Sequence, residues 1–154
     1  MTRRLFIVYA GNPGGRAEQL RAAVSNGVRE VTAVIDLRER RALDADADDL
    51  RWAEGVILDT PEHFGYMSGA LKDFFDRTFY PCENHTVGLP WALFISAGND
   101  GTGAVAAVER IVKGYRWKVV ADPVIVVGMP DTNALERCRE LGATLAAGLI
   151  AGIF

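Results

Sequence analysis

Short apolar runs alternate with amphipathic segments along the whole chain, and this alternation restricts the folds that it can adopt. Five apolar runs indicate buried strands, at residues 5–9, 31–37, 56–58, 92–96 and 119–127. Five segments with apolar residues at helical spacing indicate helices, at about 16–26, around Leu50, from Met67 onward, at about 105–115 and at about 132–150. We therefore expect one α/β, doubly wound domain spanning residues 1–154, in which helices cover both faces of a five-stranded parallel sheet.

Glycine and proline mark two of the expected boundaries. The first helix is expected to stop near Gly27, because glycine often follows the last turn of a helix. Pro123 interrupts the fifth apolar run, and a proline inside a strand confines that strand to a sheet edge or a bulge.

Composition excludes several classes of function. The net charge is −3, from 17 basic and 20 acidic side chains, with no basic patch for nucleic acid and no acidic tail. Two cysteines and two histidines lack the spacing of metal ligands, so we expect no metal site. The apolar run at 5–10 is too short for a signal peptide or a membrane span, and we predict a cytoplasmic protein with no membrane partner.

Three loops rich in glycine and small polar residues follow the first, third and fourth expected strands, at 11–16, 60–69 and 96–103. In an open parallel sheet these loops lie outside the carboxyl ends of the strands, where ligands bind. We expect them to form one pocket whose walls are mostly backbone.

The first loop has the residues that a phosphate site needs. Gly14 and Gly15 allow main-chain N–H groups to converge where a helix begins, and Arg16 adds a cation. No serine or threonine lies between Ala10 and Arg16, so the main chain and Arg16 must bind the anion. The alternative is a tight strand-to-helix turn with a solvated Arg16.

The other two loops are suited to a flat ring system. Exposed aromatics and a backbone loosened by Gly65 and Gly69 favour an apolar, hydrogen-bonding ligand, although Phe64 and Met67 in the same loop could instead cap the core. The loop at 96–101 is expected at the opposite edge of the ring. Its alternative interpretation is an ordinary helix start, with Asn99 or Asp100 as the N-cap.

The block from Thr60 to Arg77, Thr-Pro-x-x-Phe-Gly-x-Met-Ser-Gly-x-Leu-Lys-x-Phe-x-Asp-Arg, resembles the flavin-binding segment of the flavodoxin-like family. It is most similar to the NAD(P)H-dependent FMN reductases and to the quinone reductases related to the tryptophan-repressor-binding protein. The resemblance implies strand order 2-1-3-4-5 and non-covalently bound FMN, with NAD(P)H as reductant. It also implies hydride transfer through flavin N5 to a small-molecule acceptor, a quinone or a flavin, in a homo-oligomer (dimer or tetramer).

By this resemblance the phosphate lies on the first loop, the isoalloxazine against residues 62–67, and the third loop on the other side of the ring. The cofactor-binding residues so predicted are Asn12, Gly14, Gly15, Arg16, Ala17, Pro61, Glu62, His63, Phe64, Gly65, Tyr66, Met67, Ser96, Ala97, Gly98, Asn99 and Gly101. Because the cofactor performs the redox step, no side-chain general base is expected. His63 is the one candidate for proton delivery, and its alternative role is to shape the pocket.

Three other functions stay open. Electron-carrier flavodoxins share the expected fold, but they are typically very acidic and cover both flavin faces with aromatics, which the third loop lacks. A dinucleotide-binding domain would use Asp36 for a ribose, but the first turn does not read G-x-G-x-x-G. A non-catalytic binding module is the third alternative, because fold does not fix function.

Overall fold

A computed structural model describes residues 2–31 and 34–154. Its parallel strands lie in the order β2-β1-β3-β5, with β6 and β7 both paired to β5, and a short antiparallel strand, β4, paired to β3. The strands are β1 (Arg3–Tyr9), β2 (Ile35–Arg41), β3 (Gly55–His63), β4 (Tyr66–Met67), β5 (Pro90–Ala97), β6 (Lys118–Val119) and β7 (Val124–Val127). Apart from β4, this is the predicted doubly wound order, and the fold class is confirmed.

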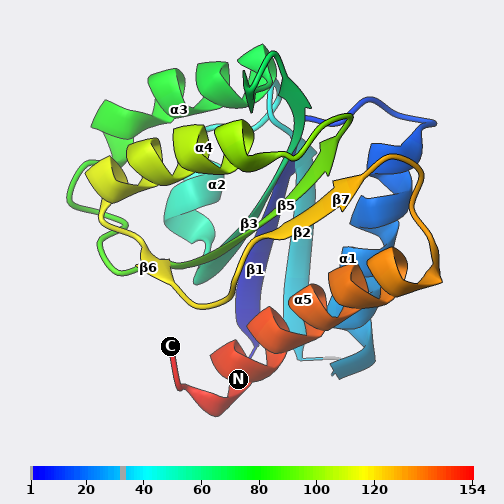
Figure 1. The fold of residues 1–154 in the computed structure, drawn as a ribbon. Helices are drawn as coiled ribbons and strands as arrows, with labels where there is room; N and C mark the ends of the chain where they lie inside the picture. The colour runs from blue at the N-terminus through cyan, green and yellow to red at the C-terminus, as the bar shows by residue number, and fades with distance from the viewer. Residues whose placement is uncertain (1, 32–33) are drawn as a thin grey trace.

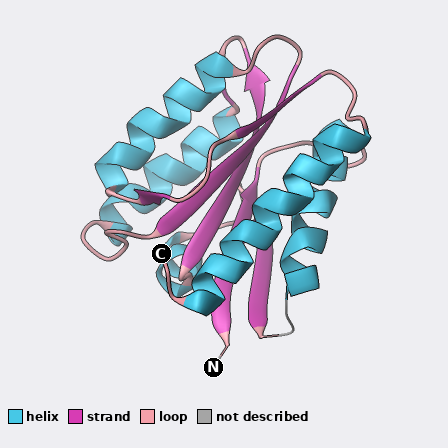
Figure 2. Ribbon diagram, turned by 60° about the horizontal axis from the view of Figure 1, so that its bottom comes forward, coloured by secondary structure: helices cyan, strands magenta, loops and turns pink. Residues whose placement is uncertain are grey.

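Helices cover both faces of the sheet, as Figures 1 and 2 show. On one face lie α1 (Arg16–Val31) and α5 (Thr132–Ala151), and on the other lie α2 (Ala47–Trp52), α3 (Gly69–Cys82) and α4 (Thr102–Tyr115). Successive strand residues point to opposite faces, so each face has its own core. In β1, for example, Phe6 and Val8 pack toward α3 and α4, whereas Leu5 and Ile7 pack toward α1 and α5.

Large aromatic side chains fill the α3/α4 face. The ring of Phe75 lies 5.9 Å from that of Phe74, 5.7 Å from that of Tyr115 and 6.5 Å from that of Trp117. The Tyr115 hydroxyl donates to the Phe75 carbonyl at 2.9 Å and lies 2.8 Å from Thr78 Oγ1. The buried polar atoms of this cluster are therefore hydrogen-bonded.

Small residues fill the contact between α1 and α5. A Cβ on Gly27 would lie 1.9 Å from the carbonyl oxygen of Arg139, and one on Gly142 would lie 2.0 Å from that of Val24. The two helices therefore touch backbone to backbone.

This contact explains why the first helix passes its expected end. Gly27 was expected to stop the helix, but α1 continues to Val31, because Gly27 serves here to admit α5. The expected strand at 31–37 is accordingly displaced, and β2 runs from Ile35 to Arg41. Residues 32 and 33 of that prediction lie outside the described residues.

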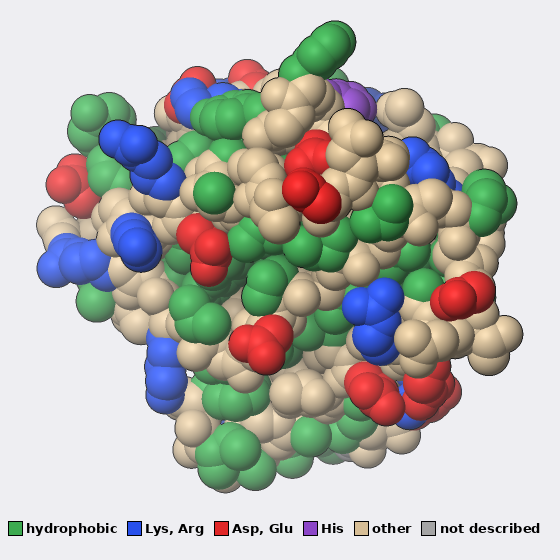
Figure 3. All heavy atoms as spheres, viewed as in Figure 1, with side chains coloured by type: hydrophobic (Ala, Val, Ile, Leu, Met, Phe, Trp, Pro, Cys, Tyr) green, Lys and Arg blue, Asp and Glu red, His purple; other side chains and the backbone are tan. Residues whose placement is uncertain are grey.

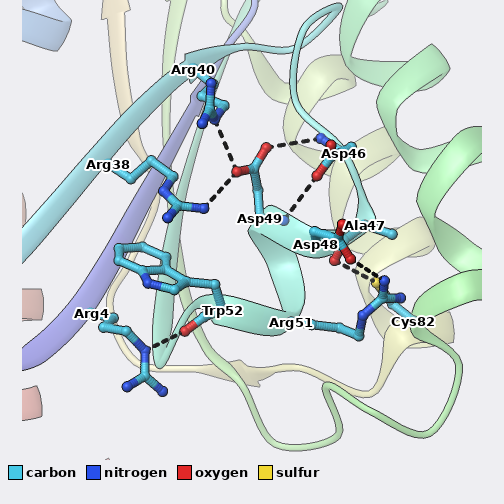
Figure 4. A network of polar contacts seen from close by, with 10 residues as sticks. All are labelled: Arg4, Arg38, Arg40, Asp46, Ala47, Asp48, Asp49, Arg51, Trp52 and Cys82. Atoms are coloured by element: carbon cyan, nitrogen blue, oxygen red, sulfur yellow. Dashed lines mark hydrogen bonds and ion pairs between the residues drawn. The ribbon is translucent and has the colours of Figure 1, made fainter.

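A polar network holds α2 beside the edge strand β2 (Figure 4). The Asp46 and Asp49 side chains accept each other's main-chain N–H groups at 3.0 Å, which caps the helix. Asp49 also accepts from Arg38 at 2.8 Å and from Arg40 at 2.9 Å, and the Arg38 guanidinium lies 4.0 Å above the ring of Trp52. The network thus pairs two charged residues of β2, Arg38 and Arg40. Hydrophobic periodicity alone would not identify this edge strand.

The predicted interruption of the fifth strand is confirmed. β6 pairs with the start of β5 and β7 with its end, and Pro123 lies in the segment between them at the edge of the sheet. The break leaves the carboxyl end of β5 flanked by β7.

Candidate functional site

A cleft of about 240 Å³ lies at the carboxyl edge of the sheet, between the first loop and the ends of β3 and β5. All of its lining residues belong to the predicted cofactor-binding set: Asn12, Gly15, Arg16, Ala17, Pro61, Glu62, His63 and Ser96. The other predicted residues are not among those that line the cleft, and their roles stay predictions. The structure therefore brings together the three loops that are far apart in sequence.

The first loop presents main-chain N–H groups at the start of α1. Gly14 has φ +80°, a conformation that glycine adopts at little cost, and neither Gly14 nor Gly15 has an atom within 4 Å of the position of a Cβ. The Gly14 N–H donates to Glu18 Oε2 at 2.9 Å. The carboxylate of Glu18 thus accepts the hydrogen bond of one main-chain N–H group of this loop.

Glu18 is half exposed and also lies 3.6 Å from Arg21, which offers its carboxylate another partner. A phosphate oxygen is the same kind of acceptor as this carboxylate oxygen, and the N-terminus of α1 favours either anion. The residues present therefore fit the phosphate of FMN, with Arg16 and the N–H groups of residues 15–17 at the cleft.

The second loop differs from the expected plain turn. β3 extends to His63 and turns back into β4, with His63 opposite Tyr66 and Glu62 opposite Met67. The two residues at the tip, Phe64 and Gly65, have φ values of +52° and +70°, the pattern of a tight type I′ hairpin turn. Sequence reasoning missed the hairpin because a phenylalanine rarely adopts a positive φ.

The side chains of this hairpin diverge in burial. Phe64 is fully exposed and Tyr66 is 44% exposed, whereas Met67 is buried in the core beside α3 and α4. Of the two residues whose alternative role was to cap the core, Met67 does so and Phe64 does not. The hairpin therefore presents aromatic groups at the rim above a fixed base.

The third loop contacts the hairpin. Gly101 N–H donates to Glu62 Oε1 at 3.3 Å, and a Cβ on Gly103 would lie 2.1 Å from the Gly65 carbonyl oxygen. Gly98 and Asn99 are exposed at the rim, and Ala97 is buried. These contacts join two walls of the cleft.

The N-cap of α4 is neither of the two expected residues. Gly101 holds that position with φ +75°, and a side chain there would meet Ile125 Cγ2 at 2.6 Å. Asp100 lies one residue earlier and accepts from the N–H and the hydroxyl of Thr102 at 3.0 and 2.8 Å. These hydrogen bonds lower the pKa of Asp100.

The two histidines lie at opposite edges of the sheet. His63 lines the cleft, whereas His85 lies in the loop after α3, with its Nδ1 2.9 Å from the Glu83 carbonyl oxygen. His85 instead lines a hollow near Arg3, where the strands begin. Of the two histidines, His63 is therefore the one that lies at the cleft.

Asp59, at the end of the apolar part of β3, is a buried residue beside the site that is not among the predicted cofactor-binding residues. It is 1% exposed, and its Oδ2 accepts the Gly11 N–H at 3.0 Å, directly below the first loop. Burial raises its pKa to about 7, against the opposing effects of Gly11 and Arg21. The signal in the sequence was an aspartate that directly follows the apolar run at 56–58.

Other features limit the chemistry of the described residues. No group of three or more histidine, cysteine or acidic residues in residues 2–31 and 34–154 could hold a metal ion. Cys82 and Cys138 are both buried and free, and burial raises the pKa of each thiol, that of Cys138 to about 11.

Two observations concern the surface. Among the described residues, no helix is long and apolar enough to cross a membrane. The face drawn in Figure 3 carries acidic and basic side chains interspersed with hydrophobic ones. Charge of one sign therefore does not dominate this face.

A family model described as NADPH-dependent FMN reductase matches residues 11–131. An NAD(P)H dehydrogenase (quinone) of Acidithiobacillus ferrooxidans is 27% identical over 158 aligned positions, covering 90% of this chain and 74% of the relative. A flavodoxin of Aquifex aeolicus is 26% identical, covering 93% of this chain and 85% of the relative. The resemblance predicted from the block at 60–77 is thereby confirmed.

Among solved structures, a flavodoxin described as a WrbA-like protein from Agrobacterium tumefaciens superposes with a TM-score of 0.80 at 16% identity. The superposition covers 97% of this chain and 99% of the other. At this identity the match shows the fold.

Proposed function

The chain belongs to the NADPH-dependent FMN reductase family, and on that premise we propose that it is an FMN-dependent reductase that passes electrons from NAD(P)H to a quinone or a free flavin. FMN is the cofactor of the family and NAD(P)H its reductant. The observation that carries the proposal is the cleft at the carboxyl edge of the sheet, lined by the first loop, the end of β3 and Ser96.

The first loop would hold the phosphate. Gly15, Arg16 and Ala17 line the cleft at the N-terminus of α1, where their main-chain N–H groups, the Arg16 guanidinium and the helix dipole would attract the anion. Glu18 would leave the Gly14 N–H to a phosphate oxygen and turn to Arg21.

The hairpin and the third loop would hold the ring. Pro61, Glu62 and His63 form one wall of the cleft, and Phe64 and Tyr66 stand at its rim. The buried Met67 side chain supports the hairpin from below, so we assign it no contact with the ring. When bound, FMN supplies the redox step, and the protein contributes position and electrostatics.

His63 is the proposed proton donor to a reduced acceptor, because it is exposed at the cleft and an imidazole can pass a proton to a substrate. A homodimer or tetramer and a cytoplasmic location stay predictions. Phe154, beyond the end of α5, packs against Gly148 of that helix, while Ile153 is 70% exposed and is a surface that a second copy could cover.

The test is anaerobic titration of the purified protein with FMN and then with NADPH or NADH. We expect FMN to bind and its visible absorbance to bleach on addition of the nicotinamide, then to return when a quinone or free FMN is added. Arg16→Ala should weaken FMN binding about tenfold or more, because it removes a charge-assisted hydrogen bond.

Arg29→Ala is the matched control, since Arg29 lies at the far end of the same helix and pairs with Glu39. It should leave FMN affinity unchanged within about twofold. A colourless protein that does not take up added FMN would refute the proposal.

The flavodoxin relative supports a second candidate, an electron carrier without a nicotinamide substrate. The same titration separates the two functions. A carrier binds FMN but is not reduced by NADPH or NADH on the timescale of turnover, and it requires a separate reductase protein.

A further inference from the structure

Asp59 is a carboxyl group enclosed between the sheet and the α1/α5 face. Its neighbours across the sheet are Tyr9 in β1 and Phe94 in β5. Because side chains alternate along a strand, Asp59 lies on the same side as Ile57, whose side chain packs in the α1/α5 core. An aspartate at such a site has lost its hydration.

The contacts of Asp59 tie it to the first loop. Its Oδ2 accepts the Gly11 N–H, and its main-chain carbonyl accepts the Ala10 N–H at 3.1 Å. A Cβ on Gly11 would lie 2.4 Å from the Ala17 Cβ and 3.0 Å from Asp59 Oδ2. The carboxyl group therefore lies against the backbone that turns into the phosphate-binding residues.

The second carboxyl oxygen of Asp59 has no hydrogen bond among the described residues. Oδ1 is buried and has no hydrogen-bond partner among residues 2–31 and 34–154. A buried charge is costly unless it is paired, and one main-chain N–H satisfies only one side of a carboxylate. The site therefore favours the neutral, protonated acid.

The charged and titratable groups that act on Asp59 come from both covering helices. Arg21 of α1 stabilises the carboxylate, but its guanidinium is shared with Glu39 at 3.0 Å and lies 4.0 Å above the Tyr9 ring. Cys138 of α5 is a buried thiol with a raised pKa, so it is neutral at neutral pH. Desolvation exceeds the opposing effects of the Gly11 and Ala10 N–H groups and of Arg21, and raises the pKa of Asp59 to about 7.

We propose that Asp59 is a proton-binding site coupled to the anion site of residues 11–17, which takes up a proton when the loop binds phosphate and releases it when the phosphate leaves. This inference rests on the proposed function in taking the phosphate to be that of FMN. A bound dianion disfavours a second negative charge beneath the same loop. The proton goes from solvent to the carboxyl group, and no other bond changes.

The coupling has a sign that opposes the usual trend for phosphate ligands. The second pKa of a phosphate monoester is about 6, so its dianion, and usually its affinity, increases as pH rises. Here affinity should fall as pH rises above about 7, because binding must then protonate Asp59. We expect a loss of about fivefold to tenfold in FMN affinity from pH 7 to 8.5.

Calorimetric titration of the apoprotein with FMN at pH 7.5 to 8, in two buffers of different ionisation enthalpy, counts the protons directly. The wild-type protein should take up a fraction of one proton for each FMN bound. Asp59→Asn keeps the size of the side chain and an acceptor for Gly11 N–H, and it should lose both this uptake and the fall in affinity with pH.

Asp100→Asn is the matched control. Asp100 also accepts a main-chain N–H at the start of a helix on this edge of the sheet, but it is exposed and its pKa is lowered. This variant should keep the wild-type proton uptake. FMN binding without proton uptake by the wild-type protein, or uptake that persists in Asp59→Asn, would overturn the inference and leave the proposed function intact.

A ligand-free measurement separates the two hypotheses further. A carboxyl group whose pKa rises on folding costs stability as pH rises from its unfolded value toward its folded value. The unfolding constant of the wild-type apoprotein relative to that of Asp59→Asn should therefore grow up to tenfold per pH unit from pH 5 to 7, and level off above. If this growth is present but FMN does not bind, the proposed function fails, and the coupling with it; if FMN binds and the growth is absent, only the role of Asp59 fails.

Discussion

On the α3/α4 face of the sheet, the Tyr115 hydroxyl is buried among aromatic rings and is hydrogen-bonded to Thr78 and to the Phe75 carbonyl. On the α1/α5 face, Asp59 is buried beneath the first loop with one oxygen unpartnered among the described residues. Both are polar groups within apolar cores. The Tyr115 hydroxyl has two hydrogen-bond partners, whereas only one of the two Asp59 carboxyl oxygens has a partner.

We connect the hydrogen-bonded Tyr115 with the stability of the fold and the partly unpartnered Asp59 with the proposed ligand binding. Satisfied buried polar groups fix one arrangement of a core, whereas an unsatisfied one costs free energy that persists only where something else compensates. Large aromatic side chains pack on the α3/α4 face, whereas Gly27 and Gly142 each let the main chain of the facing helix approach at the α1/α5 contact. Each face has a buried side-chain atom without a hydrogen-bond partner among the described residues, Trp91 Nε1 on the α3/α4 face and Asp59 Oδ1 on the α1/α5 face, but only Asp59 lies beneath the first loop.

The largest effect is expected on the aromatic face. Phe75→Ala removes a ring that lies against three others and should lower the free energy of unfolding by about 4 kcal/mol. Urea unfolding followed by circular dichroism measures it. Tyr80→Ala on the same helix is the control, because Tyr80 is 76% exposed and should cost far less. Equal losses from the two variants would contradict the assignment of stability to this cluster.

A smaller loss is expected where α1 meets α5. Gly142→Ala improves helix propensity by about 1 kcal/mol, but the new methyl group would lie 2.0 Å from the Val24 carbonyl oxygen. Because the obstacle is a main-chain atom, we take the upper end of the cost of overpacking, about 3 kcal/mol, and expect a net loss of about 2 kcal/mol in the same urea assay. Thr144→Ala, at an exposed position of α5, should be neutral or slightly stabilising. A stabilised Gly142→Ala would show that the helices are free to separate.

The smallest effect tests the hydrogen bonds of Tyr115. Tyr115→Phe keeps the ring but removes the partner of Thr78 and of the Phe75 carbonyl, and should cost about 1.5 kcal/mol. FMN affinity should not change, because this cluster lies inside the core and not at the cleft. A loss of FMN binding without a loss of stability would break the separation between the two faces.

Much of the fold follows from the sequence because most strands are buried on both faces. The runs at 5–9, 56–58 and 92–96 are apolar except for Ser96, and each lies within a strand of the structure. β2 is different, since an edge strand is partly solvated and the charged residues Arg38, Arg40 and Arg41 hide its period. A local pattern does not reveal that Asp49 on α2 pairs with two of them.

The sequence-based interpretation of glycine was correct in the first loop and wrong in the first helix. Gly14 and Gly15 were interpreted from their freedom at a turn, and they lie where the first loop opens to the cleft or beside it. Gly27 was interpreted by the same local rule, but its role is to admit a helix that follows it by more than a hundred residues. Sequence alone does not distinguish a glycine that bends the chain from one that makes room for a distant segment.

The positions of the candidate site residues were predictable because the topology fixes which loops meet. Their conformations were not. The hairpin at Phe64 depends on a positive φ that phenylalanine disfavours, and the pKa of Asp59 depends on how many neighbours remove its water. Both are properties of the assembled tertiary structure.

The close approach of Gly103 to the Gly65 carbonyl oxygen holds the β3–β4 hairpin against the first turn of α4, main chain to main chain. The position of the hairpin relative to α4 therefore does not depend on a side-chain rotamer. Substitutions of exposed side chains such as His63 and Asn99 should therefore change the surface at this edge of the sheet while the main chain of the hairpin keeps its place.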